Sequence, residues 1–438
     1  MSNTLEPVAT QATESVFTAG PDFASHPEAF RASQSAAWET FSSLPMPRRT
    51  DETWRFTDTR KLSLEGFVRA EAVTDAEQAS LLVRSKGLEK TSGRMVFAND
   101  RLLVCEMHGE DLRAKGVLWL PLEQAIAEHP ELIARYFMQE KTVLGSAKFA
   151  ALHASQVRAG MVLVVPKGVE ISLPVETFHW LSGENASVFP HTLIVAGENS
   201  KFTVVDHFAS AGETAGLAIG VNDIVAGAGA KVTYVAIQDW SRSATAFHLN
   251  ATTVARDASS LALRLNLGGS FVRDEAVSRL RGPGGRSDML SVTTALGSQI
   301  FDQRTLQVHE APNAASDLLY KNALNDTART VFTGLIRVDE GAHKTDAYQK
   351  VRNLVLSEEA EANSAPGLEI EADDVRCTHG ATSGALDEDE IFYFQSRGIP
   401  RRVAQQLVTF GFLSEVFERI PDADLAAHLS DCLHGKLG

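Results

Sequence analysis

Cys377 and His379, in the stretch "DDVRCTHGAT" from 373 to 382, are the residues whose types and spacing most suggest chemistry. If this stretch is a strand, side chains at i and i+2 point to the same face, with Cα atoms about 6.6 Å apart. A thiolate and a neutral imidazole suit iron, zinc or copper(I). The pair therefore predicts two ligands of one metal site, or, in the structural alternative, a small buried thiol beside a hydrogen-bonded histidine.

Two ligands do not hold a metal firmly, because structural zinc and iron–sulfur centres take about four protein ligands each. No Cys-x-x-Cys accompanies the pair. The missing ligands would come from elsewhere in the chain or from a second chain, and an incompletely held cluster is easier to hand on. The spacing thus favours a shared, transient site.

Two enzymatic alternatives use the same region. In a nucleophilic pair, His379 would lower the pKa of Cys377 and take its proton, but parallel side chains on one strand face are poorly placed for that contact. A carbohydrate-active β-solenoid enzyme would instead use a carboxylate pair. The candidates for such a pair are Glu369, Glu371, Asp373 and Asp374. A solvated turn is the simpler interpretation of these four carboxylates.

The composition predicts a folded globular protein, since 44% of the 438 residues are hydrophobic and 22% are charged. A formal net charge of −15 argues against nucleic-acid partners. Three cysteines are too few for a disulfide framework, which fits a reducing compartment. The first twenty residues lack the pattern of a targeting peptide, and no apolar run approaches the ~20 residues that span a bilayer. We therefore expect a cytoplasmic protein without a membrane partner.

Residues 1–136 have the mixed pattern of a helical or α+β module. The stretch 25–44 predicts a helix with Ser25 as its cap, and a second helix is expected at 122–138. Between these two helices, the stretch "RMVFANDRLLVCEM" predicts a β-hairpin with its turn at Asn99-Asp100. Trp54, in "TWRFTD", is interpreted as local packing within this module.

Residues 137–386 are rich in β-branched and small residues and contain a repeat. "IVAGENSKFTVV" begins at Ile194 and "IVAGAGAKVTYV" at Ile224, 30 residues later. Short strands of this kind bury a continuous core when successive coils stack, which predicts a β-solenoid. An antiparallel sandwich of hairpins is the alternative. The glycine-rich "RGPGGR" at 281 to 286 lacks the ending of a phosphate-binding loop and is interpreted as a solenoid turn.

Residues 387–438 return to helical patterns. Asp387 and Glu390 form a capping-box arrangement, Gly398 marks a stop, and Gly411 is expected to interrupt the following helix. The segment carries many large apolar groups, which need a surface to cover. Among the remaining candidates, Cys105 is expected in the core, Cys432 is expected to be exposed, and His309 is expected in a turn or the core.

Several of these stretches, taken together and in order, resemble the SufB/SufD family, and most closely its SufD branch. The resemblance rests on "DQRTLQVHEAPNAASDLLYKNAL", "TARTVFTGLIRV", "HKTDAYQKVRNLVLS", "APGLEIEADDVRCTHGATSGALDEDEIFYFQSRGI" and "GFLSEVFERI". Two positions depart from the family pattern, since Thr378 replaces a commoner serine and His191 stands where arginine is expected.

The resemblance implies a mainly β protein: a right-handed parallel β-helix flanked by helical N-terminal and C-terminal modules. It implies a non-catalytic subunit of the SufBCD complex for iron–sulfur cluster assembly, paired with the paralogue SufB and with the ATPase SufC. A homodimer in isolation is left open. The nascent, transient cluster would form between SufB and SufD, with His379 and, more weakly, Cys377 as its ligands here. SufC would dock on the C-terminal helices, at Phe392, Tyr393, Arg397, Phe410, Phe412 and Phe417. Without a Walker A sequence, the chain is expected to bind no nucleotide itself.

Overall fold

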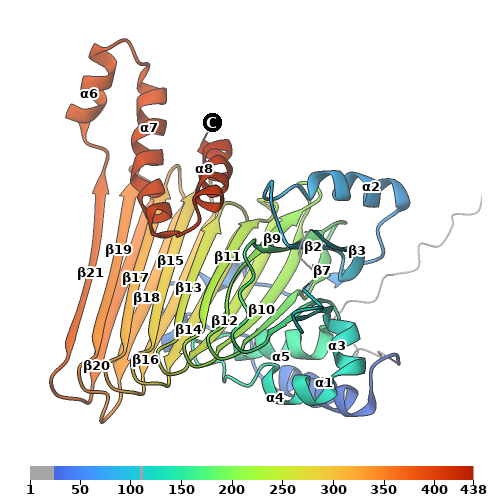
Figure 1. Ribbon diagram of the computed structural model, residues 1–438. Coiled ribbons are helices and arrows are strands. Elements are labelled where there is room, and N and C mark those ends of the chain that lie inside the picture. The colour runs from blue at the N-terminus through green and yellow to red at the C-terminus, as the bar shows by residue number, and fades with distance from the viewer. Residues whose placement is uncertain (1–23, 109–111, 438) are drawn as a thin grey trace, which may run out of the picture.

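The structure is a computed structural model that describes residues 24–108 and 112–437. Its dominant feature is a stack of parallel strands that forms a β-solenoid of about eight turns (Figure 1). Helices gather at its two ends in sequence, as predicted. Among the described residues, no helix is long and apolar enough to cross a membrane.

Successive strands of the solenoid alternate between two sheets. The first sheet holds β4 (Leu118–Pro121), β5 (Gly160–Val165), β8 (His191–Ala196), β10 (Gly216–Ala226), β12 (Ala244–Val254), β14 (Phe271–Leu280), β16 (Ile300–His309), β18 (Arg329–Val338) and β20 (Glu361–Ile370), with β1 (Val68–Arg69) and β7 (Ala186–Val188) beside them. The second holds β2 (Gly93–Ala98), β3 (Arg101–Met107), β6 (Val175–Leu181), β9 (Lys201–Ser210), β11 (Lys231–Asp239), β13 (Ser259–Asn266), β15 (Arg286–Ala295), β17 (Ala315–Leu324), β19 (Asp346–Val355) and β21 (Arg376–Ala385). The repeat is in direct register, because Ile194 pairs with Ile224 in parallel strands. The solenoid prediction is confirmed and the antiparallel sandwich is wrong.

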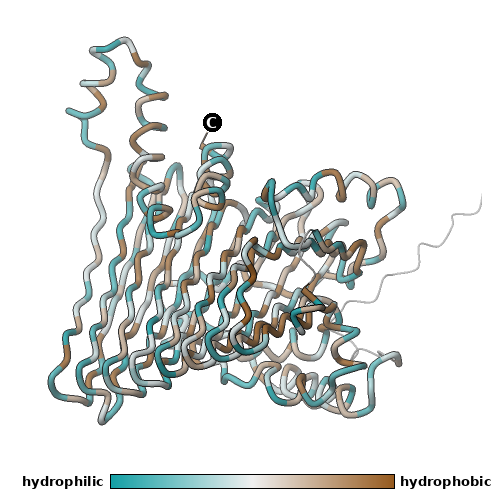
Figure 2. Tube along the Cα trace, viewed as in Figure 1, coloured by the Kyte–Doolittle hydropathy of each residue, from teal (hydrophilic) through white to brown (hydrophobic). Residues whose placement is uncertain are grey.

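One corner of every coil turns through a residue in the left-handed backbone region. These residues recur every 27 to 31 positions and are Asn199, Gly229, Asp257, Gly284, Asn313, Lys344 and Asp374, with φ between 54° and 71°. Asn, Asp and Gly tolerate this conformation best, and they supply all of these turn residues except Lys344. The "RGPGGR" stretch is one of these turns, as predicted. Figure 2 shows that the turns along the lower edge of the solenoid are largely hydrophilic.

The N-terminal module contains α1 (Glu28–Ser43), η1 (Glu52–Trp54), η2 (Thr59–Lys61), α2 (Asp75–Arg84), α3 (Leu122–Glu128), α4 (Pro130–Tyr136) and α5 (Ala147–Gln156). The predicted hairpin is confirmed as β2–β3, with Asn99 and Asp100 at positive φ. The predicted Ser25 cap is wrong, because α1 begins at Glu28 after Pro27 and has no side-chain cap. The module continues the solenoid, since β2 pairs in parallel with β6 and the β2–β3 hairpin closes that end of the second sheet.

Trp54 does not pack only within its own module, which corrects the expectation from sequence. The guanidinium of Arg273 on β14 lies 3.8 Å from the centre of a Trp54 ring. Arg273 is completely buried, donates to Glu275 at 2.8 Å and also pairs with Asp302. Thr57 donates its hydroxyl proton to Asp302 at 2.6 Å. The sequence could not reveal this docking, because the partners lie more than 200 residues apart.

The C-terminal module consists of α6 (Glu388–Ser396), α7 (Arg401–Ser414), η3 (Glu415–Arg419) and α8 (Ala423–Leu437). Asp387 caps α6 by accepting from the Asp389 amide, and Gly398 follows at a φ of 80°. The expected break at Gly411 is wrong, because α7 runs through it to Ser414. Apolar residues of α7, η3 and α8 pack on the outer face of the second sheet. The N-terminal half of α7 and all of α6 project beyond the ends of the strands (Figure 1).

We expect Arg273→Ala to lower the free energy of unfolding by about 3–5 kcal/mol, because it leaves Asp302 and Glu275 buried with less compensation. Urea denaturation followed by tryptophan fluorescence measures the loss. Arg329→Ala, which removes an exposed arginine 3.5 Å from Glu361, is the control and should change the midpoint little. Equal effects of the two substitutions would contradict the role given to Arg273.

Candidate functional site

The C-terminal end of the solenoid stops at two parallel strands and is open, whereas the other end is finished by the antiparallel strands β3 and β4. In each sheet the last strand has a neighbour on one side only: β20 pairs with β18, and β21 pairs with β19. These two strands are the outermost of the stack at the left of Figure 1. Every residue of both strands is half-buried or exposed. The end of the stack therefore presents two unpaired sheet edges, each ten residues long.

Cys377 and His379 lie on β21, at this open edge. They pair in register with Ala347 and Gln349 of β19, whose side chains are buried inside the solenoid. Because register neighbours in a parallel sheet share a face, both side chains belong to the inward face of the last coil. The predicted i, i+2 arrangement on one strand face is confirmed. Cys377 packs against an apolar cluster that includes Ile336 and Val338, while His379 is exposed.

The electrostatics of Cys377 disfavour a nucleophile. Burial raises the pKa of its thiol above the ordinary value, and the nearby negative charge of Asp346 raises this pKa further. The thiol therefore stays protonated at neutral pH, whereas a catalytic cysteine needs a lowered pKa. The nearest cation on the same strand, Arg376, lies 3.8 Å from Asp346. This environment speaks against the acyl-transfer alternative.

The donor set of the open edge is suited to a soft or borderline metal but is incomplete. Within residues 24–108 and 112–437, no group of three or more His, Cys, Asp or Glu side chains is arranged to hold a metal ion. Cys377 and His379 can thus supply at most part of a coordination sphere. Any stable metal or cluster bound there needs ligands from outside the described chain.

The carboxylates of the enzymatic alternative are all exposed, at the end of β20 and in the turn that leads to β21. Asp374 is the left-handed residue of that turn, with φ 54°. A glycosidase pair works inside a substrate cleft, with one carboxyl group held protonated by its surroundings. The solvated-turn interpretation of these residues therefore fits the structure.

The apolar groups of the C-terminal module divide into two sets. Phe392 and Tyr393 on α6 are 69% and 55% exposed, and Leu407 on α7 is 44% exposed. Arg397 stacks over the Tyr393 ring at 4.4 Å. By contrast, Phe410 and Phe412 are partly buried against the solenoid, and Phe417 is fully buried there. The solenoid thus already covers Phe417, and the uncovered set lies on the projecting part of the helices.

A buried lysine joins α7 to the solenoid. Lys321 of β17 donates to the backbone carbonyl of Phe412 at 2.7 Å and also pairs with Glu415. Its ammonium lies 4.6 Å from the centre of the Phe412 ring. On the next strand, β19, the Arg352 guanidinium lies 3.7 Å from Glu415. The end of α7 is therefore fixed to two strands of the second sheet, and β19 is the direct neighbour of β21.

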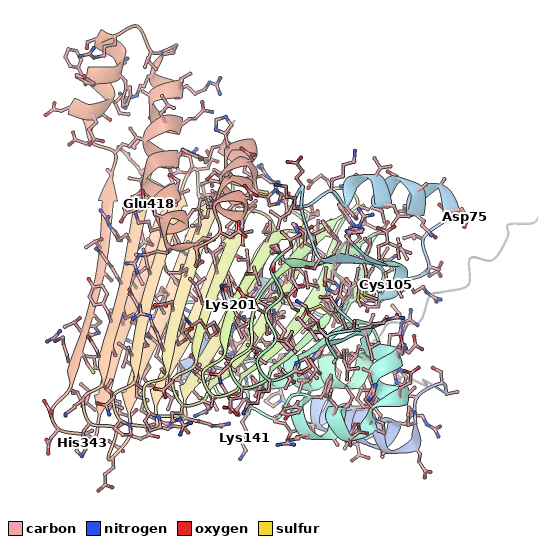
Figure 3. All side chains as sticks on the ribbon, viewed as in Figure 1. Asp75, Cys105, Lys141, Lys201, His343 and Glu418 are labelled. Carbon is pink, nitrogen blue, oxygen red and sulfur yellow. The ribbon has the colours of Figure 1, made fainter. Side chains whose placement is uncertain are left out.

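The remaining sequence candidates stand apart from the open edge. Cys105, expected in the core, is exposed on the edge strand β3, on the side of the molecule away from His343 and the last coils (Figure 3). Cys432, expected to be exposed, is half-buried on α8, and burial raises its pKa to about 11. His309 is a buried core histidine hydrogen-bonded to Ser316, within the predicted range.

The sequence reasoning missed a buried histidine chain beneath the N-terminal module. His153 Nδ1 lies 2.7 Å from the Ile219 carbonyl, and its Nε2 lies 3.1 Å from His191 Nδ1. His191 Nε2 in turn lies 3.4 Å from Asp223, which accepts the Met138 amide. His191 is the position noted for its departure from arginine. Both histidines are completely buried, and the three hydrogen-bonded residues join α5 to β8 and β10, which indicates a structural role.

Comparison with known proteins gives one consistent result. The family model described as "SUF system FeS cluster assembly, SufBD core domain" matches residues 179–412, more than half of the chain, and "SufBD protein N-terminal region" matches residues 23–177. The iron-sulfur cluster assembly protein SufD of Bacillus subtilis is 29% identical over 92% of each chain. SufD of Escherichia coli is 28% identical over 87% of this chain and 86% of its own. An iron-sulfur cluster assembly SufBD family protein of Synechocystis is 27% identical over 91% and 89%.

We expect iodoacetamide to alkylate Cys377 slowly at pH 7 and faster only as the pH rises through a pKa above the ordinary value of about 8.5. The rates are measured by mass spectrometry of the separate peptides that carry Cys105, Cys377 and Cys432. Cys432, whose pKa is about 11, should react at a still higher pH and serves as the internal comparison. Rapid labelling of Cys377 at neutral pH would instead revive the nucleophile hypothesis.

Proposed function

The chain belongs to the SufBD family of iron–sulfur cluster assembly proteins, and from this premise we propose that it is a non-catalytic scaffold subunit on which a nascent cluster is built and handed on. The observation that carries this proposal is the position of Cys377 and His379 on an unpaired sheet edge. Cys377 and His379 supply only part of the ligands that a cluster needs. A second subunit has to complete the site, and separation of the two subunits opens it again.

The partner that completes the edge is a SufB-type paralogue. β20 and β21 offer two rows of free backbone groups, and strand addition to such edges is a general mode of protein recognition. A second solenoid that ends in the same way has matching free edges. Joining two ends would continue both sheets across the interface and enclose His379 between the subunits.

The ATPase SufC is proposed to dock on the projecting part of α6 and α7. The exposed side chains Phe392, Tyr393 and Leu407 supply the apolar anchor that such an interface needs. Beside them, an open groove of about 760 Å³ runs between these helices and the rim of β19 and β21, and Phe394 and Val408 line its apolar wall. Asp387, Asp389 and Glu390 form its acidic side.

Movement of the ATPase can reach the cluster site through α7. The contacts of Lys321 and Arg352 fix the base of this helix to β17 and β19. β19 carries the register partners of Cys377 and His379. A force on the projecting helices therefore acts on the strands that support the open edge. ATP hydrolysis itself falls to SufC, because this sequence contains no G-x-x-x-x-G-K-[ST] motif.

We expect His379→Ala to abolish most cluster formation in the complex. The chain is co-expressed with its SufB and SufC partners and supplied with iron and sulfide under anaerobic reducing conditions, and cluster absorption is compared with that of wild type. His108→Ala is the control, because this histidine is also exposed but directly follows β3 in the N-terminal module. Co-purification of the three proteins checks that both variants assemble.

Equal loading of wild type and His379→Ala in an intact complex would contradict the ligand role and leave the edge as an interface only. Cys377→Ala is expected to have the weaker effect, since its thiol is protonated and half-buried. Loss of loading in both histidine variants would point to a general defect rather than to the cluster site.

For SufC docking, we expect the double variant Phe392→Ala/Tyr393→Ala to weaken binding by about 30-fold or more, as is usual when exposed aromatic anchors are removed. Calorimetry or surface plasmon resonance with purified SufC measures the change. Phe56→Ala removes an exposed aromatic side chain from the N-terminal module and should leave the affinity unchanged. Unchanged affinity of the double variant would place the ATPase elsewhere.

A further inference from the structure

The glutamine next to His379 inside the solenoid has a free hydrogen-bond acceptor. Gln349 of β19 is the register partner of His379 and lies on the same inward face, one strand spacing of about 4.8 Å away. Its side chain is completely buried. The amide nitrogen donates to the Gly334 carbonyl at 3.5 Å, whereas the amide oxygen Oε1 is buried without a hydrogen-bond partner. A buried acceptor left in this state is costly, so its presence calls for an explanation.

The contact with Gly334 fixes which way the amide group of Gln349 faces. A carbonyl oxygen can only accept, so the amide atom that faces the Gly334 carbonyl is the nitrogen, and Oε1 is the atom left free. Gly334 also keeps the space beside Oε1 open, because a Cβ atom at position 334 would lie 2.7 Å from it. The interior of the solenoid therefore presents a free acceptor one strand away from the exposed histidine.

His379 has few other acceptors within reach. Across residues 24–108 and 112–437, no hydrogen bond or ion pair involves its ring. The residue opposite it in the last coil is Pro366, because Pro366 is the register partner of Gly334 as His379 is of Gln349. Proline offers no polar side-chain atom. Asn353, the next polar side chain of β19 that faces inward, is already hydrogen-bonded to two serines of the last coil.

A histidine that binds a metal through one ring nitrogen almost always donates the N–H of its other nitrogen to an oxygen acceptor. This second bond fixes the tautomer and the plane of the ring. An exposed imidazole without such a partner can take either tautomer and can turn about its side-chain bonds. Gln349 Oε1 is a neutral acceptor of the required kind, and it lies on the side of His379 that faces into the solenoid.

We propose that Gln349 is a positioning residue for the cluster site: its Oε1 accepts the N–H of one ring nitrogen of His379 and directs the other nitrogen toward the nascent cluster. The inference rests on the proposed function, which makes His379 a ligand, and adds the residue that orients this ligand. Gln349 acts through His379 and does not contact the cluster. The bond forms when a second subunit covers the open end and the ring of His379 is enclosed.

The test removes the acceptor without a large change in volume. Gln349→Met keeps an unbranched side chain of similar length and removes both polar atoms of the amide. Gln307→Met is the matched control, because Gln307 of β16 is also completely buried inside the solenoid and also has an unpartnered Oε1. Gln349→Glu is the conservative variant, because it keeps an oxygen acceptor at the same position.

Each variant is assembled with purified SufB and SufC partners and titrated anaerobically with ferrous iron in the presence of sulfide, while cluster absorption is followed. We expect Gln349→Met to need at least about tenfold more iron for half-maximal loading, the loss that is usual when the hydrogen-bond partner of a metal-binding histidine is removed. Gln307→Met should load like wild type. Gln349→Glu should retain most of the loading.

A spectroscopic measurement separates positioning from a general loss of stability. In pulsed EPR of the reduced cluster, the remote ring nitrogen of a bound histidine gives a coupling that depends on the hydrogen bond made by its N–H. Labelling this chain alone with ¹⁵N-histidine assigns the coupling to its own histidine. Gln349→Met should change the remote-nitrogen coupling in the fraction that still loads, whereas Gln307→Met should leave it unchanged.

Equal loading curves and equal remote-nitrogen couplings of wild type and Gln349→Met overturn the inference, and they leave the proposed function intact as long as His379→Ala abolishes loading. Equal losses in Gln307→Met and Gln349→Met assign the effect to packing inside the solenoid and also overturn it. So does a Gln349→Glu variant that assembles but loads as poorly as Gln349→Met. Normal loading of His379→Ala removes the proposed function, and the inference with it.

Discussion

A strand in a parallel sheet satisfies its backbone only when it has a neighbour on each side, and the architecture of this chain follows from how that condition is met at the two ends of the solenoid. Between the ends, each coil supplies the neighbour of the next, so the register of Ile194 on Ile224 continues coil after coil. At the N-terminal end the antiparallel strands β3 and β4 pair with the last parallel strands, β2 and β5, and form the sheet edges themselves. At the C-terminal end nothing in the described chain pairs with the outer sides of β20 and β21, and both strands stay half-exposed. The open end is thus the place where the fold is incomplete.

The two helical modules cover the outer faces of the sheets, which are also apolar. The N-terminal helices pack on the first sheet around Phe149 and Phe247, and the C-terminal helices pack on the second around Leu265 and Phe417. In each case a buried cation fixes the module: Arg273 beneath Trp54, and Lys321 beneath Phe412. Buried ion pairs of this kind contribute little net stability, since desolvation offsets their attraction, but removing one partner is costly. They therefore specify where the modules dock more than how strongly.

Local sequence patterns predict the strands, turns and helices well, but they do not predict which residues far apart in the sequence pack together. The 30-residue repeat, the Asn99-Asp100 hairpin and the placement of Cys377 beside His379 each depend on neighbours along the chain or on a fixed strand period, and all three are confirmed. The contact of Trp54 with the solenoid could not be predicted, because its partner Arg273 is 219 residues away in the sequence. Cys105 was misjudged because alternation predicts one buried face, whereas β3 is an edge strand with little packed against it. The chain of His153, His191 and Asp223 had no local signal at all, since three separate elements contribute to it.

In the proposed function, an incomplete set of metal ligands at an unpaired sheet edge suits a cargo that must leave. A site enclosed in one chain would hold a metal with all its ligands and release it only by local unfolding. Here the thiol of Cys377 stays protonated and the imidazole of His379 stays exposed until another surface covers them. Under the proposed function, binding and release would depend on subunit contact, which the helices fixed to β17 and β19 could influence. In the proposed function, the edge that leaves the solenoid unfinished is what would allow a shared site to open and close.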